Sequence, residues 1–256
     1  MDYHWTIQQL KDYIKNRNLT EKEIEILRTD QRKGAQKLYK QYKQHLIKEQ
    51  QAVEKFEEMQ KYENTQRSRG KAYIAGVDEV GRGPLAGPVV AAAVILPQTF
   101  LLKGLDDSKK LNKKKRELFY QYIVENAHCY SIGVVPPYEI DEMNIYQATK
   151  AAMYQAVDKL SIKPDHVLID AVELDDLGVS SNAIVKGDQK SISIAAASIV
   201  AKVARDQMMS ELHQTYPVYE FDQNSGYGTK KHLEALKQYG VTSHHRRSFL
   251  KSVLSR

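Results

Sequence analysis

The first seventy residues carry apolar positions at helical spacing and no pattern typical of a strand. Thr6 with Gln9, and Thr20 with Glu23, have the spacing of capping boxes that open helices. Residues 65–70 (TQRSRG) have the composition of a linker. The sequence therefore predicts a helical N-terminal extension over residues 1–70, linker included. Its helical stripes are Ile7, Leu10 and Ile14, then Leu38, Tyr42 and Leu46, which Val53 and Phe56 extend.

From Lys71 onward, short apolar runs alternate with longer helical patterns. The first two runs are joined by a segment rich in glycine and proline, residues 81–87, and therefore predict a hairpin. The order that follows favours an α/β domain over residues 71–256, with a mixed central sheet flanked by helices. The predicted strands are 72–78, 88–96, 129–137, 166–171 and 182–188. Residues 102–127 are predicted to form a basic loop that leads into a helix. Further helices are predicted over 139–160, 191–216, 230–239 and 248–254.

Composition restricts the partners. The chain has 256 residues, a formal net charge of +6 and 42% hydrophobic residues, so a large core can form and a polyanionic partner is favoured. The single cysteine, Cys129, excludes an internal disulfide framework and is expected to be a small buried thiol. The N-terminus is polar, and the longest apolar run, VVAAAVIL, is too short to span a bilayer. We expect a soluble cytoplasmic protein.

Four carboxylates stand at the ends of predicted strands. Asp78 and Glu79 follow the first, Asp170 follows the fourth, and Asp188 follows the fifth. A single Asp in such a place is usually a turn or capping residue, but parallel strands would bring the group to one edge of the sheet. Clustered carboxylates repel one another unless a cation is present, and oxygen ligands suit Mg²⁺ or Mn²⁺. No His or Cys spacing favours zinc.

The segment GRGPLAG (81–87) adds a loop with few side chains directly after the acid pair. Neighbouring residues on a strand face opposite ways, so Asp78 and Glu79 share a site only if the strand bends, which Gly81 and Gly83 permit. A hairpin turn capped by one acid is the alternative. A dinucleotide-binding loop would open a helix, whereas Pro88 leads into another strand.

These motifs resemble those of the ribonuclease HII family. The resemblance begins with VDEVGRGPLAGPVVAAAV (77–94) and covers roughly residues 71–250. The sister family, ribonuclease HIII, usually lacks the arginine between the glycines, so Arg82 favours HII. The remaining motifs follow in the family's order: DSKKL (107–111), LIDA (168–171), KGD (186–188), IAAASIVAKVARD (194–206), GYGT (226–229) and HRRSF (245–249).

The resemblance implies an RNase H-like fold and an endoribonuclease that uses Mg²⁺ or Mn²⁺, expected to act as a monomer with two ions when substrate is bound. It implies hydrolysis of the RNA strand in RNA–DNA hybrids and incision 5′ of ribonucleotides embedded in duplex DNA, which leaves a 3′-hydroxyl and a 5′-phosphate. The residues it assigns are Asp78, Glu79, Asp170 and Asp188 for the metal site, Gly81, Arg82 and Gly83 for the 2′-hydroxyl and the backbone, Tyr227 for stacking on the following sugar, and Lys109 for phosphates.

Other polar groups have two interpretations each. The basic run 109–116 is either a solvated face or a phosphate contact, and Arg205 with Asp206 suggests a structural pair. Residues 244–247 (HHRR) suggest a basic tail or the approach to a docked last helix, with His244 and His245 as weak metal candidates. Residues 1–70 either grip the duplex or only pack on the core. Two competing functions remain: a nucleic-acid-binding protein with an inactive site, and a dinucleotide-dependent oxidoreductase.

Overall fold

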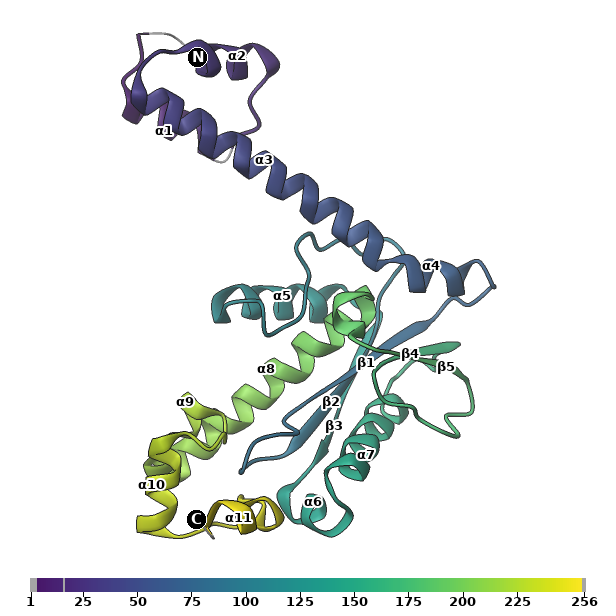
Figure 1. Cartoon of the computed structure of the whole chain (residues 1–256). Coiled ribbons are helices and arrows are strands. Elements are labelled where there is room, and N and C mark those ends of the chain that lie inside the picture. Colours follow the sequence, from purple (N-terminus) through teal and green to yellow (C-terminus); the bar gives the residue numbers. More distant parts are fainter. Residues whose placement is uncertain (1–3, 16, 255–256) are drawn as a thin grey trace. The chain divides into compact units, whose positions relative to one another are not determined.

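The structure is a computed structural model that describes residues 4–15 and 17–254, with side chains described as far as residue 250. The chain forms two compact units, Met1–Lys55 and Phe56–Arg256 (Figure 1). Among the described residues, no helix combines the length and the apolar composition that crossing a bilayer requires.

The first unit contains α1 (Ile7–Ile14), α2 (Glu21–Thr29) and most of α3 (Lys33–Met59). The two predicted capping boxes are confirmed, because Thr6 and Thr20 each exchange hydrogen bonds with the residue three positions later. The predicted stripes also face inward: Leu10 and Tyr42 are buried in one small core, and the Tyr42 hydroxyl accepts a hydrogen bond from the Leu19 amide at 2.8 Å.

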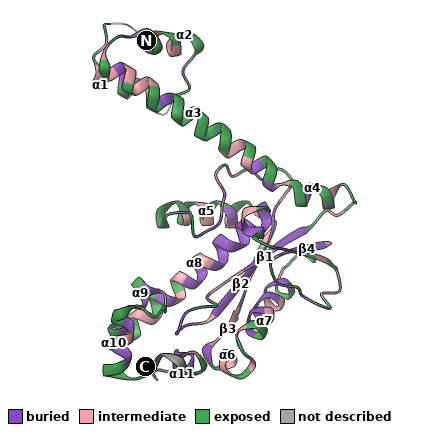
Figure 2. Ribbon diagram, in the orientation of Figure 1, coloured by how far each residue is buried: buried purple, intermediate pink, exposed green. Residues whose placement is uncertain are grey.

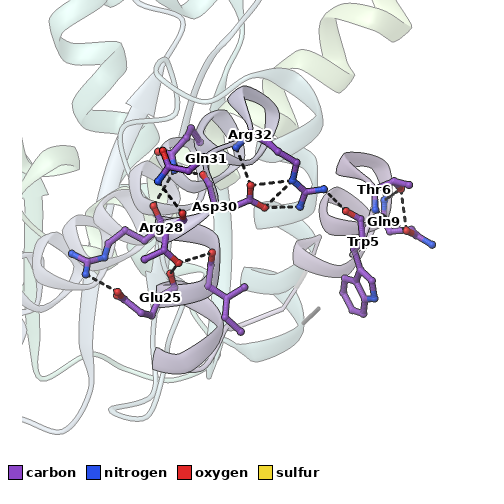
Figure 3. Close-up of polar contacts among 11 residues, drawn as sticks. Trp5, Thr6, Gln9, Glu25, Arg28, Asp30, Gln31 and Arg32 are labelled. Carbon is purple, nitrogen blue, oxygen red and sulfur yellow. Dashed lines mark hydrogen bonds and ion pairs between the residues drawn. The ribbon is translucent and has the colours of Figure 1, made fainter. Parts of the chain in front are cut away.

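Polar contacts fix the corner between α2 and α3 (Figure 3). The Arg32 guanidinium makes a two-pronged ion pair with Asp30, at 3.0 Å and 2.5 Å to Oδ2, and donates to the Trp5 carbonyl oxygen at 2.5 Å. Arg28 pairs with Glu25 on the surface of α2. The Arg32 side chain therefore joins the start of α3 to Asp30 and to Trp5 before α1.

The second unit is built on a five-stranded mixed sheet, as the sequence predicts. Its strands are β1 (Ile74–Val80), β2 (Val89–Ile95), β3 (Cys129–Val135), β4 (His166–Asp170) and β5 (Ser180–Ile184), in the order β3-β2-β1-β4-β5. β1 pairs antiparallel with β2 and parallel with β4, and β4 pairs parallel with β5. The carboxyl ends of β1, β4 and β5 thus lie at one edge of the sheet.

Helices cover both faces of the sheet (Figure 1). On β2, Ala92 and Val94 face a core that includes α5 (Lys113–Asn126) and the small residues of α8 (Ile192–Thr215). Ala91 and Ala93 face the opposite core, formed with α6 (Pro137–Met143) and α7 (Ile145–Asp158). The central strands and the first half of α8 are accordingly the most buried parts of the unit (Figure 2). Cys129 is half-buried against the second core.

Two predicted boundaries are wrong. The single helix expected over 139–160 is broken at Asn144, whose φ of 72° is incompatible with a continuous helix and whose side chain instead caps α7 through the amides of Tyr146 and Gln147. The strand expected over 182–188 ends at Ile184, because Lys186 adopts a left-handed conformation. The chain then forms the short 3₁₀ helix η1 (Gly187–Gln189), which carries Asp188.

The remaining elements flank this arrangement. α4 (Lys61–Arg67) covers part of the segment predicted as a linker, and the Glu63 carboxylate is buried, where it accepts hydrogen bonds from Ser191 Oγ and the Ser193 amide at the start of α8. The last segments are η2 (Pro217–Tyr219), α9 (Phe221–Asn224), α10 (Lys230–Tyr239) and α11 (Arg247–Leu254). Leu250 of α11 is buried, which confirms a docked last helix.

Candidate active site

The four candidate carboxylates lie at the carboxyl edge of the sheet. Asp78 and Glu79 lie just before Val80, the last residue of β1. Asp170 is the final residue of β4, the parallel neighbour of β1. Asp188 lies in η1, four residues beyond the end of β5. Pairing of β1 with β2 continues through Val80, so the bend comes at Gly81, whose φ is +92°, and not between the two acids.

These carboxyls perturb one another. Burial, then the charges of Glu79 and Asp170, raises the pKa of Asp78 well above its ordinary value. Burial also raises the pKa of Glu79, against the opposing hydrogen bond and charge of Arg82. Asp188 has its pKa raised to about 6, by burial first and then by the charges of Asp107 and Asp170. The charges of Glu79 and Asp170 thus act on Asp78, and the charge of Asp170 also acts on Asp188.

Protein donors occupy some of the carboxylate oxygens. Asp78 Oδ1 accepts from the Glu79 amide at 2.7 Å, Asp170 Oδ1 accepts from the Gly187 amide at 2.7 Å, and Glu79 Oε1 pairs with Arg82 Nη1 at 3.0 Å. Among the described residues, no three or more His, Cys, Asp or Glu side chains are grouped as a metal site in this geometry. Glu79 Oε2, however, is buried and has no hydrogen-bond partner, so this acidic oxygen is left without a protein donor.

Two residues that sequence reasoning left without a role belong to the same environment. Asp107 is 7% exposed, and its charge acts on Asp170 and Asp188. Ser198 on α8 opposes the rise in the pKa of Asp78 through its hydroxyl, which lies 3.0 Å from Ser108 Oγ. Asp107 opens the DSKKL motif, which was the available signal, whereas Ser198 lies in a helix whose pattern indicates only packing.

Lys109 supplies positive charge beside the acids. Burial acts to lower the pKa of Lys109, but the charges of Asp107, Asp78, Asp188 and Glu79 outweigh it, and the pKa is raised. The basic run 109–116 therefore begins at the carboxylate cluster before it continues into α5.

The glycine loop and Tyr227 are neighbours. A side chain placed on Gly83 would lie 3.5 Å from the Tyr227 ring, and this ring is 50% exposed. At Gly81 a Cβ would lie only 2.3 Å from Arg205 Nε, so only glycine fits there. The loop leads into β2 and not into a helix, which excludes the dinucleotide-binding arrangement.

One expectation about the basic residues is wrong, and of the two interpretations of residues 244–247 the basic tail is excluded. Arg205 does not pair with Asp206: its guanidinium binds the carbonyl oxygens of Pro88, Ala86 and Ser225, while Asp206 pairs with Lys202 at 2.5 Å. In the HHRR segment, His245 and Arg246 are buried, so the segment is not a basic tail. His245 Nε2 lies 3.1 Å from His232 Nε2.

Comparison with known proteins agrees with the motifs. Residues 75–252 match the family model Ribonuclease HII, and residues 6–67 match Ribonuclease HII N-terminal domain. The chain is 55% identical over 246 residues to Ribonuclease HII of Bacillus cytotoxicus, covering 96% of this chain and 95% of that protein. It is 54% identical over 246 residues to Ribonuclease HII of Bacillus cereus strain B4264, covering 95% of each.

Solved structures support the fold. The crystal structure of ribonuclease H2 from Pyrococcus horikoshii OT3 superposes with a TM-score of 0.60 at 30% identity, over 69% of this chain and 93% of that one. Bst-RNase HIII, solved in complex with Mn²⁺, gives a TM-score of 0.58 at 19% identity, over 72% of this chain and 69% of that one, and shows the shared fold alone. The chain therefore belongs to the ribonuclease HII family and is a ribonuclease H, an endoribonuclease.

Proposed function

We propose that the protein hydrolyses the RNA strand of RNA–DNA hybrids and incises duplex DNA on the 5′ side of an embedded ribonucleotide, leaving a 3′-hydroxyl and a 5′-phosphate. Such incision would serve the removal of ribonucleotides from DNA. The protein is proposed to act as a monomer. The observation that carries the proposal is the joint position of the carboxylate cluster, the glycine loop and Tyr227 at one edge of the sheet.

The ribonuclease HII family depends on divalent metal, and the donor set here suits Mg²⁺ or Mn²⁺. Asp78, Glu79, Asp170 and Asp188 offer only oxygen ligands, and each has a raised pKa that a cation would relieve. When bound, a pair of divalent ions supplies an activated water and stabilises the leaving oxygen. The buried Glu79 Oε2, which has no protein partner, is the most direct sign that this set is built for a cation.

Recognition of the ribose is assigned to the glycine loop. Gly81, Arg82 and Gly83 follow β1 directly, so main-chain groups of the loop can approach a sugar closely and test for the 2′-hydroxyl. The exposed Tyr227 ring, next to Gly83, would stack on the sugar of the following deoxynucleotide, where a second 2′-hydroxyl would crowd it. Lys109, whose charge faces the acids, would hold a phosphate of the same strand.

The N-terminal unit is proposed to hold the duplex backbone. The stretch of α3 from Lys33 to Lys48 contains five lysines and no acidic residue. With 3.6 residues per turn, Lys33, Lys37, Lys40 and Lys48 lie within about 80° of one another. All four are exposed, and Tyr42 on the opposite side of the helix is buried. The alternative is a helical cap that only packs on the core.

One experiment tests the main proposal. A DNA duplex with a single embedded ribonucleotide is incubated with the protein, with and without Mg²⁺, and the nick is mapped at nucleotide resolution. We expect a single incision 5′ of the ribonucleotide that requires the ion, and no incision of the same duplex made of DNA alone. Binding without incision by the wild-type protein would favour the inactive nucleic-acid-binding alternative and refute the proposal. Asp78→Asn is the matched control and should bind without cutting.

A further inference from the structure

The loop of residues 81–88 has few side chains with which to hold itself. Gly81 and Gly87 have positive φ values of +92° and +84°, and the residues between them include Gly83, Pro84 and Ala86. Glycine is the residue with the greatest conformational freedom, so a loop of this composition needs contacts from elsewhere to adopt one shape. Those contacts come from residues more than one hundred positions away in the sequence.

Arg246 supplies most of them. Its Nη2 donates to the Gly81 carbonyl oxygen at 2.5 Å and to the Gly87 carbonyl oxygen at 2.8 Å. Its Nη1 donates to the Arg82 carbonyl oxygen at 3.0 Å, and its Nε donates to the Gly87 carbonyl oxygen at 3.0 Å. The side chain is fully buried, and burial, then the charge of Arg205, lowers the pKa of Arg246 to about 9. The planar fork of a guanidinium therefore bridges the two ends of the loop.

Arg205 holds the same loop from α8. Its Nε donates to the Pro88 carbonyl oxygen at 3.0 Å and its Nη2 to the Ala86 carbonyl oxygen at 3.2 Å. Its Nη1 donates to the Ser225 carbonyl oxygen at 3.0 Å, next to the segment that carries Tyr227. This side chain is 1% exposed, so a second buried guanidinium is satisfied by backbone oxygens.

His245, the residue before Arg246, is connected through His232 to the segment that carries Tyr227. His245 Nε2 lies 3.1 Å from His232 Nε2, and His232 Nδ1 lies 2.9 Å from the Tyr227 carbonyl oxygen. The Arg246 amide also donates to the Leu85 carbonyl oxygen at 2.8 Å, and the Leu85 amide donates to the Gly226 carbonyl oxygen at 2.8 Å. The glycine loop, the start of GYGT, His245 and Arg246 thus form one hydrogen-bonded unit.

Burying two guanidinium groups side by side is unfavourable, because each loses its hydration and they repel. Hydrogen bonds to backbone carbonyl oxygens satisfy them, and an aliphatic side chain would leave those oxygens unpaired. The arrangement therefore depends on the fixed geometry of the fork, which a lysine cannot reproduce.

We propose that Arg246, together with Arg205, is a positioning residue for ribonucleotide recognition, which fixes the spacing between the glycine loop and Tyr227. The proposal rests on the proposed function. Arg246 is fully buried and contacts the loop, so it acts through the main-chain groups of Gly81 and Arg82. Its loss should weaken the recognition of a ribonucleotide while the affinity for ordinary duplex DNA is retained.

The test compares Arg246→Lys with wild type on two ligands in Mg²⁺. The values of kcat and KM are measured on a duplex with one embedded ribonucleotide, and the all-DNA duplex of the same sequence serves as a competitive inhibitor whose Ki reports general binding. We expect kcat/KM to fall at least tenfold while Ki changes less than twofold. Arg247→Lys is the matched control, because Arg247 is adjacent and exposed, and it should leave kcat/KM within threefold of wild type.

The outcomes separate the two proposals. A wild-type protein that does not cut at the ribonucleotide refutes the proposed function. An active wild type together with an Arg246→Lys variant that keeps kcat/KM within threefold, or that loses kcat/KM and Ki in equal proportion, overturns the positioning role. If thermal melting shows that Arg246→Lys is unfolded at the assay temperature, Arg205→Lys takes its place with the same expectations, because it holds Ala86 and Pro88 of the same loop.

Discussion

Replacing Asp188 with Asn is expected to stabilise the protein at neutral pH in the presence of a chelator, although it removes a residue of the proposed metal site. Asp188 is 6% exposed, and burial with the charges of Asp107 and Asp170 raises its pKa from 3.8 to about 6. An ionised carboxyl in this position is therefore unfavourable. Asparagine has nearly the same shape and cannot ionise, so it removes the repulsion.

The size of the effect follows from the difference between the folded and unfolded pKa of Asp188. Because the folded value is the higher one, wild-type stability falls as pH rises from about 4 to about 6. At about 1.4 kcal/mol per pKa unit, the loss reaches about 3 kcal/mol at pH 8 and is only about 1 kcal/mol at pH 4.5. Asp188→Asn should recover it, which corresponds to a rise in Tm of roughly 6–12 °C at pH 8.

The assay is urea unfolding and calorimetry of both proteins in EDTA at pH 4.5 and pH 8. Asp176→Asn is the control, because Asp176 is exposed and the same substitution there should change stability little at either pH. Adding Mg²⁺ at pH 8 should stabilise the wild type more than Asp188→Asn, and the variant should not cut an embedded ribonucleotide. A variant that is less stable than wild type at pH 8, or equally stabilised at both pH values, would refute the electrostatic reasoning.

Two further predictions concern the N-terminal unit and the core. Affinity for duplex falls as salt concentration rises, and the slope of log affinity against log salt reports the number of phosphates neutralised. If each lysine neutralises one phosphate, replacing Lys33, Lys37 and Lys40 with Glu should make this slope less steep by about 2–3. An unchanged slope would leave α3 with only a packing role, and the matched control is the same exchange at Lys71, Lys159 and Lys163. Gly76→Ala should cost about 3 kcal/mol or more in urea unfolding, because its Cβ would lie 2.0 Å from the Ser193 carbonyl carbon in the backbone of α8. Gly83→Ala, with its nearest atom at 3.5 Å, should change stability far less.

The sheet was predictable because its signal is local. Runs such as VVAAAVI bury every residue of β2, and the near-continuous apolar HVLI belongs to β4, which lies between two parallel neighbours. Asp78 and Asp170 could be placed at one edge because parallel strands end together. The break at Asn144 was not predictable from periodicity, since the apolar stripe of α7 continues the pattern before it.

The partners of the buried arginines could not be found from the sequence for a different reason. Pattern reasoning looks for a complementary side chain, and it paired Arg205 with its neighbour Asp206. The actual partners are backbone carbonyl oxygens, which every residue possesses, so the sequence does not indicate which of them accept the hydrogen bonds. The same holds for Arg246, which lies more than 150 residues from Gly87.

This difference follows from the role proposed for the loop. A loop that approaches a ribose with its main chain has to be nearly free of side chains, and such a loop cannot fix its own conformation. Rigid hydrogen-bond donors from other elements have to fix it, and these donors are arginines because one guanidinium can join several carbonyl oxygens at once. Asp78, Glu79 and Asp170 instead lie at strand ends, where the sheet itself sets their positions. Substitutions at Arg246 and at Asp78 should therefore fail in different ways, the first in choosing the ribonucleotide and the second in cutting it.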